Sequence, residues 1–401
     1  MKKTVFITLC VSILCFAQSR MQTTIIRKQA IGNPTICVAS FEGAPELHRK
    51  LEEILIRCGW FKVLPASQAR QASITVSANV AAAQDIARFS ATVKVNGKQT
   101  TVTADANDAN LVILKGTDAI LNALFGIPAL CSRKIVFVRH SKNNIKELYA
   151  CYLDGSGQER LTFNKAISTE PSWGHSNALV YTLAQNNALA IVLMDFANRR
   201  QRVISRTRGL NSSAALSPDG RKVALTLSRD KYVDLYVIDL ETKQEKRLTR
   251  DNSVESSPCW SPDGKQICFV SDATGIGAPR IYLVPADGSA PAKRLQIGGG
   301  EAVSPDWDRR NNHLCFSTKG SYGKYVIAIL DMSTPNGKPQ VVTAADGDWE
   351  APSWAPDGRH VICTRALKGA RDIVVVDTVR GSFRPITEGA VLSLPTWQPA
   401  R

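Results

Sequence analysis

From residue 131 to the C-terminus, short apolar runs alternate with polar loops at intervals of 10–12 residues. Runs such as 234–239 (DLYVID) and 372–377 (DIVVVD) have an alternating pattern that ends at Asp, and they are rich in β-branched residues. Period-two alternation at this spacing is typical of β-strands. The pattern therefore predicts an all-β architecture for this part of the chain.

A longer repeat is superimposed on these strands. The phrase Ser217–Gly220 (SPDG) recurs as Ser261–Gly264, and as APDG at Ala355–Gly358. A Trp or Leu anchor precedes each copy and weaker copies, at positions 173, 216, 260, 307, 354 and 397, which are 43 to 47 residues apart. Pro sets φ at the second turn position and Gly supplies a left-handed residue, so the motif has a mechanical reason to recur.

Four strands in about 45 residues, repeated six times, are typical of the blades of a β-propeller. We expect a six-bladed propeller over residues 131–401. The last repeat, Pro395-Thr396-Trp397, reads as an innermost strand with no strands of its own after it. It would complete a blade that begins with Lys134–Asp154 and so close the ring.

The preceding residues, 20–130, read as a small α/β domain. We expect strands at 34–41, 60–64 and 72–78, and a hairpin of 89–95 with 98–104 around Asn96-Gly97, a strong two-residue turn signal. An apolar stripe from Ala44 to Cys58 predicts a helix that ends at Gly59. A second helix is predicted from Asp118 to Phe125.

Residues 1–19 have the pattern of a signal peptide. Lys2 and Lys3 precede an apolar stretch of 14 residues, Thr4–Ala17, and Ala17 and Ser19 give an acceptable cleavage site. The stretch is short for a transmembrane helix. An N-terminal membrane anchor or a buried helix is the alternative. The favoured interpretation is export to the periplasm.

The charge balance is strongly basic: 50 Lys and Arg against 35 Asp and Glu in 401 residues, or 48 against 35 without the leader. An apolar content of 44% and a charged content of 21% are ordinary for a globular protein. We expect no binding to nucleic acid, because the chain is predicted to be exported and its basic residues are not interleaved with aromatic ones. Attraction to an acidic partner or anionic envelope polymer fits better.

Eight of the ten cysteines lie outside the leader, most of them in apolar runs such as 266–271 (QICFVS). Buried free thiols are the favoured interpretation. Cys259 and Cys268 flank one hairpin turn, and whether they form a disulfide is left open.

Enzyme signatures are weak. The five histidines are scattered; His175 and His360 belong to the repeated turns, and no G-x-S-x-G nucleophile motif is present. We expect no catalytic residue, cofactor or metal. The alternative is a metal-dependent sugar-processing propeller enzyme such as a lyase, whose ligands would come from different blades.

Taken together, these features resemble the TolB family, the periplasmic propeller proteins of the Tol-Pal envelope system. The resemblance rests on the leader, the α/β domain, residues 119–127 (AILNALFGI), the following strand 133–138 (RKIVFV) and the six repeats. It implies a non-enzymatic adaptor that is peripheral to the membrane, monomeric within its complex, and needed for outer-membrane integrity and cell division. The implied partners are the lipoprotein Pal at one mouth of the propeller and TolA at the N-terminal segment 21–31, with outer-membrane proteins as further candidates.

In such a propeller the innermost strand ends in the Pro-x-Trp motif and begins on the face opposite the SPDG turns. Residues just before each motif are therefore expected to ring the channel mouth and bind a partner: Glu170, Asn211, Ser212, Glu255, Ser256, Glu301, Asp348, Trp349, Glu350 and Ser393. The carboxylates among them could accept amide or basic groups; solvation of the channel water is the alternative. Trp349 is predicted to be an exposed anchor, and the motif tryptophans to be core.

Overall fold

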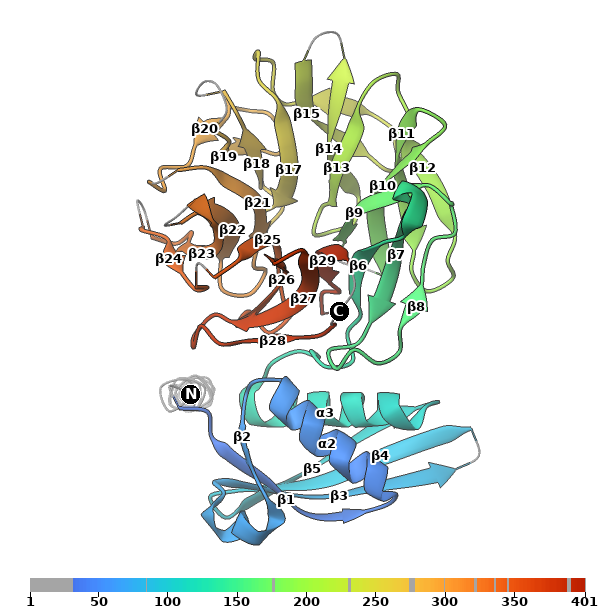
Figure 1. Cartoon of the computed structure of the whole chain (residues 1–401), viewed down its shortest axis with the longest axis vertical. Coiled ribbons are helices and arrows are strands. Elements are labelled where there is room, and N and C mark those ends of the chain that lie inside the picture. The colour runs from blue at the N-terminus through green and yellow to red at the C-terminus, as the bar shows by residue number, and fades with distance from the viewer. Residues whose placement is uncertain are drawn as a thin grey trace, which may run out of the picture. The chain divides into compact units, whose positions relative to one another are not determined.

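Figure 1 shows a computed structural model of the chain. It describes residues 32–400 except 84, 175–176, 230–231, 274–277, 299, 321–322, 335–336, 345 and 388–390. Contacts divide the chain into two compact units, Met1–Ser132 and Arg133–Arg401. The predicted leader 1–19, the segment 21–31 and His175 lie outside the described residues. Among the described helices, none has the length and apolarity needed to cross a bilayer.

The N-terminal unit contains one five-stranded sheet in the order β2-β1-β3-β4-β5 (Figure 1). Its strands are β1 (Thr35–Glu42), β2 (Lys62–Leu64), β3 (Ile74–Ala83), β4 (Ile86–Val95) and β5 (Lys98–Ala106). β1 runs parallel to β2 and β3, and the other pairs are antiparallel. Asn96 and Gly97, between β4 and β5, have φ of 49° and 77°. Two positive φ values are what a type I′ turn requires, which confirms the predicted hairpin.

The helices of this unit are α2 (Pro45–Arg57), the 3-10 helix η1 (Ala66–Gln71) and α3 (Ala109–Phe125). α2 buries Leu51, Ile54 and Leu55, as its stripe predicted. α3 packs on β4 and β5. It comes so close to the sheet that a Cβ on Gly116 would lie 2.4 Å from the Phe89 ring, so this position needs glycine.

The predicted start of the second helix at Asp118 is wrong. The helix begins at Ala109, and the Asp108 side chain caps it by accepting a hydrogen bond from Leu111 N at 2.7 Å. The buried Asp118 carboxylate instead accepts from the backbone amides of Leu130, Cys131 and Ser132, at 2.8, 2.7 and 3.0 Å.

The second unit is a propeller of six four-stranded blades (Figure 1). Blade 1 comprises β29 (Leu392–Trp397), β6 (Ile135–His140), β7 (Lys146–Cys151) and β8 (Glu159–Arg160), with η2 (Lys142–Asn144) between β6 and β7. Blades 2 and 3 comprise β9 (Ile167–Trp173), β10 (Ala178–Gln185), β11 (Ala188–Asp195), β12 (Gln201–Ser205), β13 (Asn211–Leu216), β14 (Lys222–Arg229), β15 (Tyr232–Asp239) and β16 (Glu245–Arg247).

Blades 4, 5 and 6 repeat this order. They comprise β17 (Glu255–Trp260), β18 (Gln266–Ser271), β19 (Arg280–Pro285), β20 (Lys293–Arg294), β21 (Ala302–Trp307), β22 (His313–Lys319), β23 (Tyr325–Asp331), β24 (Gln340–Val341), β25 (Asp348–Trp354), β26 (His360–Leu367), β27 (Ala370–Asp377) and β28 (Phe383–Pro385). The predicted fold class is thereby confirmed.

Blade 1 combines the two ends of the propeller sequence. β29 pairs antiparallel with β6, with Trp397 opposite Ile135 and Leu392 opposite Arg139. This is the closure that the sequence predicted. Because the ring closes through a strand pair, blade 1 has four strands like the others.

The repeated turns do structural work. In the turn of blade 3, the Ser217 hydroxyl donates to Asp219 at 2.5 Å and accepts from Lys222 N at 2.9 Å, and Gly220 has a φ of 71°. The motif tryptophans 173, 260, 307, 354 and 397 are all buried, as predicted.

Blade 6 contains a buried charge network beside its turn. Arg359 forms a two-pronged ion pair with Asp377, at 3.1 and 2.7 Å, and His360 Nδ1 lies 2.6 Å from Asp357. Burial by itself would raise the pKa of Asp377, but the hydrogen bond from Arg359 and the nearby charges hold it below its usual value. His360 is therefore a buried structural residue at the first position of β26.

Candidate functional site

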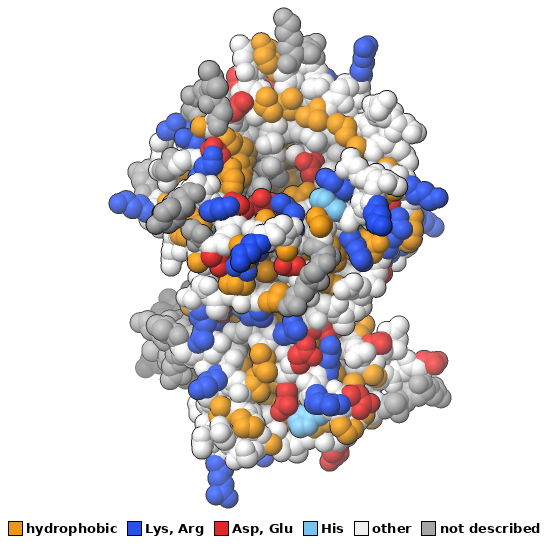
Figure 2. All heavy atoms as spheres, viewed as in Figure 1, with side chains coloured by type: hydrophobic (Ala, Val, Ile, Leu, Met, Phe, Trp, Pro, Cys, Tyr) orange, Lys and Arg blue, Asp and Glu red, His pale blue; other side chains and the backbone are white. Residues whose placement is uncertain are grey.

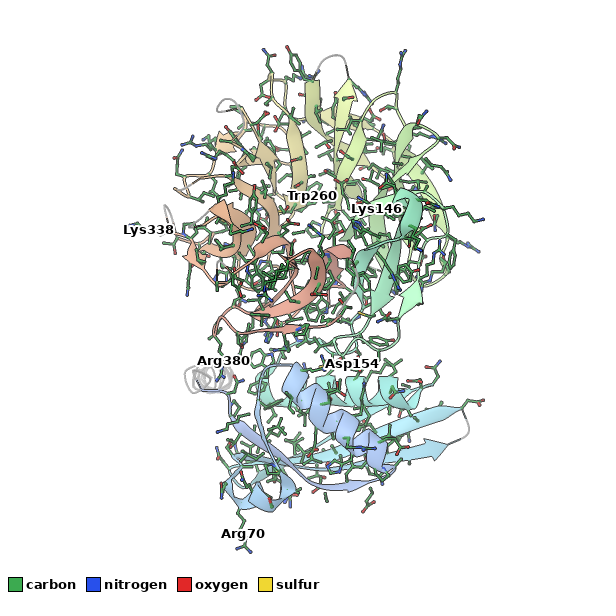
Figure 3. All side chains as sticks on the ribbon, in the orientation of Figure 1. Arg70, Lys146, Asp154, Trp260, Lys338 and Arg380 are labelled. Atoms are coloured by element: carbon green, nitrogen blue, oxygen red, sulfur yellow. The ribbon has the colours of Figure 1, made fainter. Side chains whose placement is uncertain are left out.

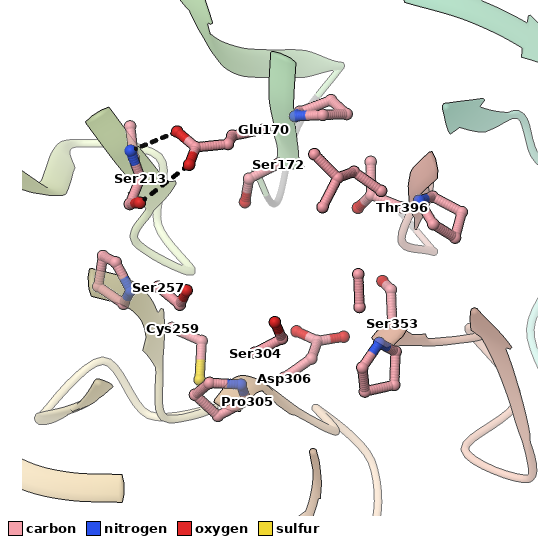
Figure 4. A pocket seen from close by; sticks show the side chains of 17 residues that line it. Glu170, Ser172, Ser213, Ser257, Cys259, Ser304, Pro305, Asp306, Ser353 and Thr396 are labelled. Carbon is pink, nitrogen blue, oxygen red and sulfur yellow. Dashed lines mark hydrogen bonds between the residues drawn. The ribbon is translucent and has the colours of Figure 1, made fainter. Parts of the chain in front are cut away.

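The inner strands of all six blades line a central channel with a cavity of about 170 Å³ (Figure 4). Each inner strand carries a bulge at the same place in its pairing with the second strand of the blade. One non-glycine residue of each bulge has a φ between 50° and 52°, and these six residues are Glu170, Ser213, Ser257, Ser304, Ala351 and Leu394. All six line the channel. Each of the six blades thus contributes to the channel wall one residue in the sparsely populated left-handed backbone conformation.

Two carboxylates face this channel, and both join neighbouring blades. Glu170 of blade 2 accepts hydrogen bonds from the amide of Ser213 at 2.8 Å and from its hydroxyl at 3.2 Å (Figure 4). Asp306 of blade 5 accepts from the amide of Trp354 at 2.7 Å. Burial raises the pKa of Asp306. These carboxylates hold the ring together as well as lining it.

A second cavity, of about 410 Å³, opens at the mouth of the channel between blades 1, 5 and 6. Its polar lining includes His140, Lys146, Tyr325, Glu350 and Arg371. Glu350 and Arg371 form an ion pair in this lining. Burial lowers the pKa of His140, and Lys146 and Arg371 lower it further. Figure 3 shows Lys146 beside the centre of the propeller.

The predicted mouth carboxylates of blades 5 and 6 are each paired with a cation. Glu301 accepts from Lys319 Nζ and from the Tyr325 hydroxyl, both at 2.6 Å. These bonds lower the pKa of Glu301, and the same contact raises the pKa of Tyr325 to about 12. Asp348 accepts from Lys324 Nζ at 2.9 Å.

The described charges at the mouth are therefore arranged as ion pairs. On the face that Figure 2 views, basic and acidic side chains are likewise interspersed.

The prediction of an exposed Trp349 is wrong. Its side chain is fully buried, and its Nε1 donates to the Ala344 carbonyl at 2.8 Å. The reason is the position of Trp349 in its strand. The residue two positions before the bulge residue of positive φ is buried in every blade: Ser168, Asn211, Glu255, Ala302, Trp349 and Leu392.

The predicted site residues Asn211 and Glu255 occupy that position in their own blades and, like Trp349, are buried. Burial raises the pKa of Glu255 to about 8. The residues one position later, Ser212, Ser256, Glu350 and Ser393, alternate to the other side of their strands. Of these, Glu350 and Ser393 line the mouth cavity.

Among the lining residues that the sequence analysis missed, the basic and aromatic ones are His140, Lys146, Tyr325 and Arg371. His140 ends β6, Lys146 begins β7 and Tyr325 begins β23. Second strands end, and third strands begin, on the face where inner strands begin. The first polar residue of each third strand was the signal that could have found Lys146, Tyr325 and Arg371, and the last residue of a second strand could have found His140.

Apolar residues accompany these charges. Val254 and Val391 directly precede the inner strands β17 and β29, and their exposed fractions are 52% and 43%. Among the described residues, no three His, Cys, Asp or Glu side chains lie together in a way that could hold a metal ion.

Residues 121–401 match the protein family described as the TolB beta propeller domain. A Tol-Pal system protein TolB from Desulfosudis oleivorans is 28% identical over 120 residues, which are 30% of this chain and 27% of that protein. A TolB homolog from Protochlamydia amoebophila is 23% identical over 309 residues, 72% of this chain and 56% of that protein. The matched segments thus span about a quarter to half of these relatives.

A crystal structure of TolB from Acinetobacter baumannii has a similar fold. Its TM-score is 0.79 at 24% identity, and the superposition covers 92% of this chain and 97% of that one.

Proposed function

The chain belongs to the TolB β-propeller family, and we propose that it is a non-enzymatic periplasmic adaptor of a Tol-Pal envelope system. In this proposal residues 1–19 are a cleaved leader, 20–130 the α/β domain and 131–401 the propeller. The adaptor acts peripherally to the membrane, as a monomer within its complex, and supports outer-membrane integrity and cell division.

We propose that the mouth of the propeller binds Pal. The observation that carries this proposal is the mosaic of ion pairs around the mouth cavity, Glu301–Lys319, Asp348–Lys324 and Glu350–Arg371. Partly exposed pairs of this kind are weak on their own, so their members can exchange partners with a docking protein. Charged groups placed in this way fix orientation and partner choice more than affinity, and the exposed Val254 and Val391 add apolar area.

The N-terminal segment 21–31 is proposed to contact TolA, and outer-membrane proteins are further proposed partners. The segment lies outside the described residues, so this part rests on family membership alone. Deleting residues 21–31 should abolish TolA binding and leave Pal binding intact; loss of both, or of neither, would contradict the assignment.

The test of the Pal site is a binding titration between the full chain and the soluble domain of Pal. Charge reversal of both Glu301 and Glu350 to Lys is expected to weaken binding at least tenfold. Glu245→Lys is the matched control, because Glu245 is a similarly exposed glutamate that pairs with Arg229 on the outer strand β16. Glu170 is not a suitable target, since its reversal would break the bonds to Ser213. Unchanged binding by the double variant, with its circular dichroism intact, would refute the site.

A further inference from the structure

Two cysteines lie opposite each other across the inner hairpin of blade 4. Cys259 in β17 and Cys268 in β18 are direct register partners on either side of the Ser261–Gly264 turn. All eight cysteines of the described chain are free and buried, and no other two of them are register partners.

The geometry of the strand pair is compatible with a disulfide between the two cysteines. Directly opposite residues of an antiparallel pair have Cα atoms about 4.5 or 5.5 Å apart, depending on the hydrogen-bonding pattern. A disulfide requires Cα atoms about 4.4 to 6.8 Å apart. Either pattern therefore allows the two sulfurs to join without moving the strands out of register.

We propose that Cys259 and Cys268 are an oxidisable pair that forms a disulfide across the inner hairpin of blade 4. The oxidising compartment that this needs rests on the export assumed in the proposed function. In the reaction, each thiol loses its proton, one S–S bond forms, and the two electrons reduce the disulfide of a thiol oxidant to two thiols. Thiol–disulfide exchange through a mixed disulfide provides this chemistry.

The two cysteines are both buried, but their surroundings differ. Cys259 lines the central channel (Figure 4), whereas Cys268 is fully buried. Burial raises the pKa of the Cys259 thiol well above its usual value, so the reactive thiolate is scarce in the folded protein. Oxidation is therefore fast while the hairpin is folding and slow afterwards, and the finished bond resists reductants in the same way.

Most other blades carry an oxygen-bearing side chain where blade 4 has Cys259. At the register position of Cys259, four blades carry Ser172, Asp306, Ser353 and Thr396. A disulfide here closes a ten-residue ring around the turn and fixes the neighbouring bulge at Ser257, and with it one sixth of the channel wall.

The experiment is refolding of the full chain from denaturant with oxidised glutathione as the probe, followed by alkylation under denaturing conditions. We expect two fewer alkylated thiols than in a sample refolded with reductant. Trypsin cleaves after Lys265, so the bond should link peptide 251–265 to peptide 266–280 in a non-reduced digest. The oxidised protein should melt several degrees above the reduced protein.

Cys268→Ala should lose the linked peptide and the redox dependence of melting. Cys315→Ala is the matched control, since Cys315 is equally buried at the equivalent position of blade 5 but faces Asp306; it should keep both. Full alkylation after oxidative refolding, or a linked peptide that joins other cysteines, would overturn the proposal. Because the readout involves no partner, a failure here leaves the adaptor proposal standing, and the reverse is also true.

Discussion

The indole ring of Trp349 packs edge to face against the ring of Phe383 within blade 6, with their centroids 5.0 Å apart. This contact places the innermost and outermost strands of the blade in one aromatic cluster. A residue that the sequence suggested as a binding anchor is therefore part of the core.

Replacing Trp349 by Ala is expected to lower the free energy of unfolding by about 3–5 kcal/mol, because it opens a cavity in a packed core. Urea denaturation followed by circular dichroism measures the change. Val379→Ala, at a residue of the same blade that is 63% exposed, should shift it by less than about 0.5 kcal/mol. A stable Trp349→Ala protein that fails only to bind a partner would restore the anchor interpretation.

Removing residues 392–401 deletes β29, the strand that closes the ring. We expect the propeller to lose cooperative folding, since β6 is left without its inner neighbour and blade 1 with three strands. Limited proteolysis and thermal unfolding measure this loss. A chain that lacks only residues 400–401 is the control and should melt like the full protein; normal melting of the longer deletion would show that closure is dispensable.

Glu255 gives the stability a pH dependence. Its carboxyl is 1% exposed and burial raises its pKa to about 8, so the folded state holds a proton that the unfolded state releases near its ordinary value. Stability from this group is therefore present at low pH and is lost as pH rises from about 4.5 through 8.

Glu255→Gln cannot ionise, and we expect it to be more stable than the natural protein by about 1–3 kcal/mol at pH 9, with the gap closing toward pH 5. Denaturant titrations at several pH values test this. A pH-independent difference for Glu255→Gln would mean that the group does not titrate in this range.

The buried pair of Arg359 and Asp377 predicts a large truncation effect. Arg359→Ala leaves a buried carboxylate without its partner and should cost about 3–5 kcal/mol. Arg229→Ala, which breaks a half-exposed pair with Glu245, should cost no more than about 1 kcal/mol.

The effect of Arg359→Ala should also shrink below about pH 4. The folded pKa of Asp377 is lowered, so its pairing stabilises the protein above the unfolded value and is lost as pH falls. Equal costs for the two arginine variants in urea titrations would contradict the buried network.

The sequence predicted the blades well because each is marked by local chemistry. The Pro-Asp-Gly turn and the tryptophan that precedes it recur at one interval, and the orphan strand ending at Trp397 pointed to closure. The turn at Asn96-Gly97 was equally readable, since the two residues alone determine its type. The helix start was misread because Asp118 serves a loop twelve residues later, and that contact has no local signal.

The mouth was predicted less well, for a reason of register. A bulge adds one residue to the inner strand, and its position depends on pairing with the second strand. Counting back from the tryptophan therefore mixed buried positions such as Asn211 with cavity-lining ones such as Glu350. Arg371 and Tyr325 come from third strands, and only the hairpin geometry places them beside the inner strand.

The pairing of β29 with β6 also determines when blade 1 can be completed during synthesis. Synthesis runs from the N-terminus, so β6 is made more than 250 residues before its partner strand β29. Blade 1 therefore has an unpaired sheet edge until the end of the propeller has been synthesised. A product that ends before β29 keeps that edge exposed to proteases. Ring closure therefore occurs only in a chain that has been synthesised through β29.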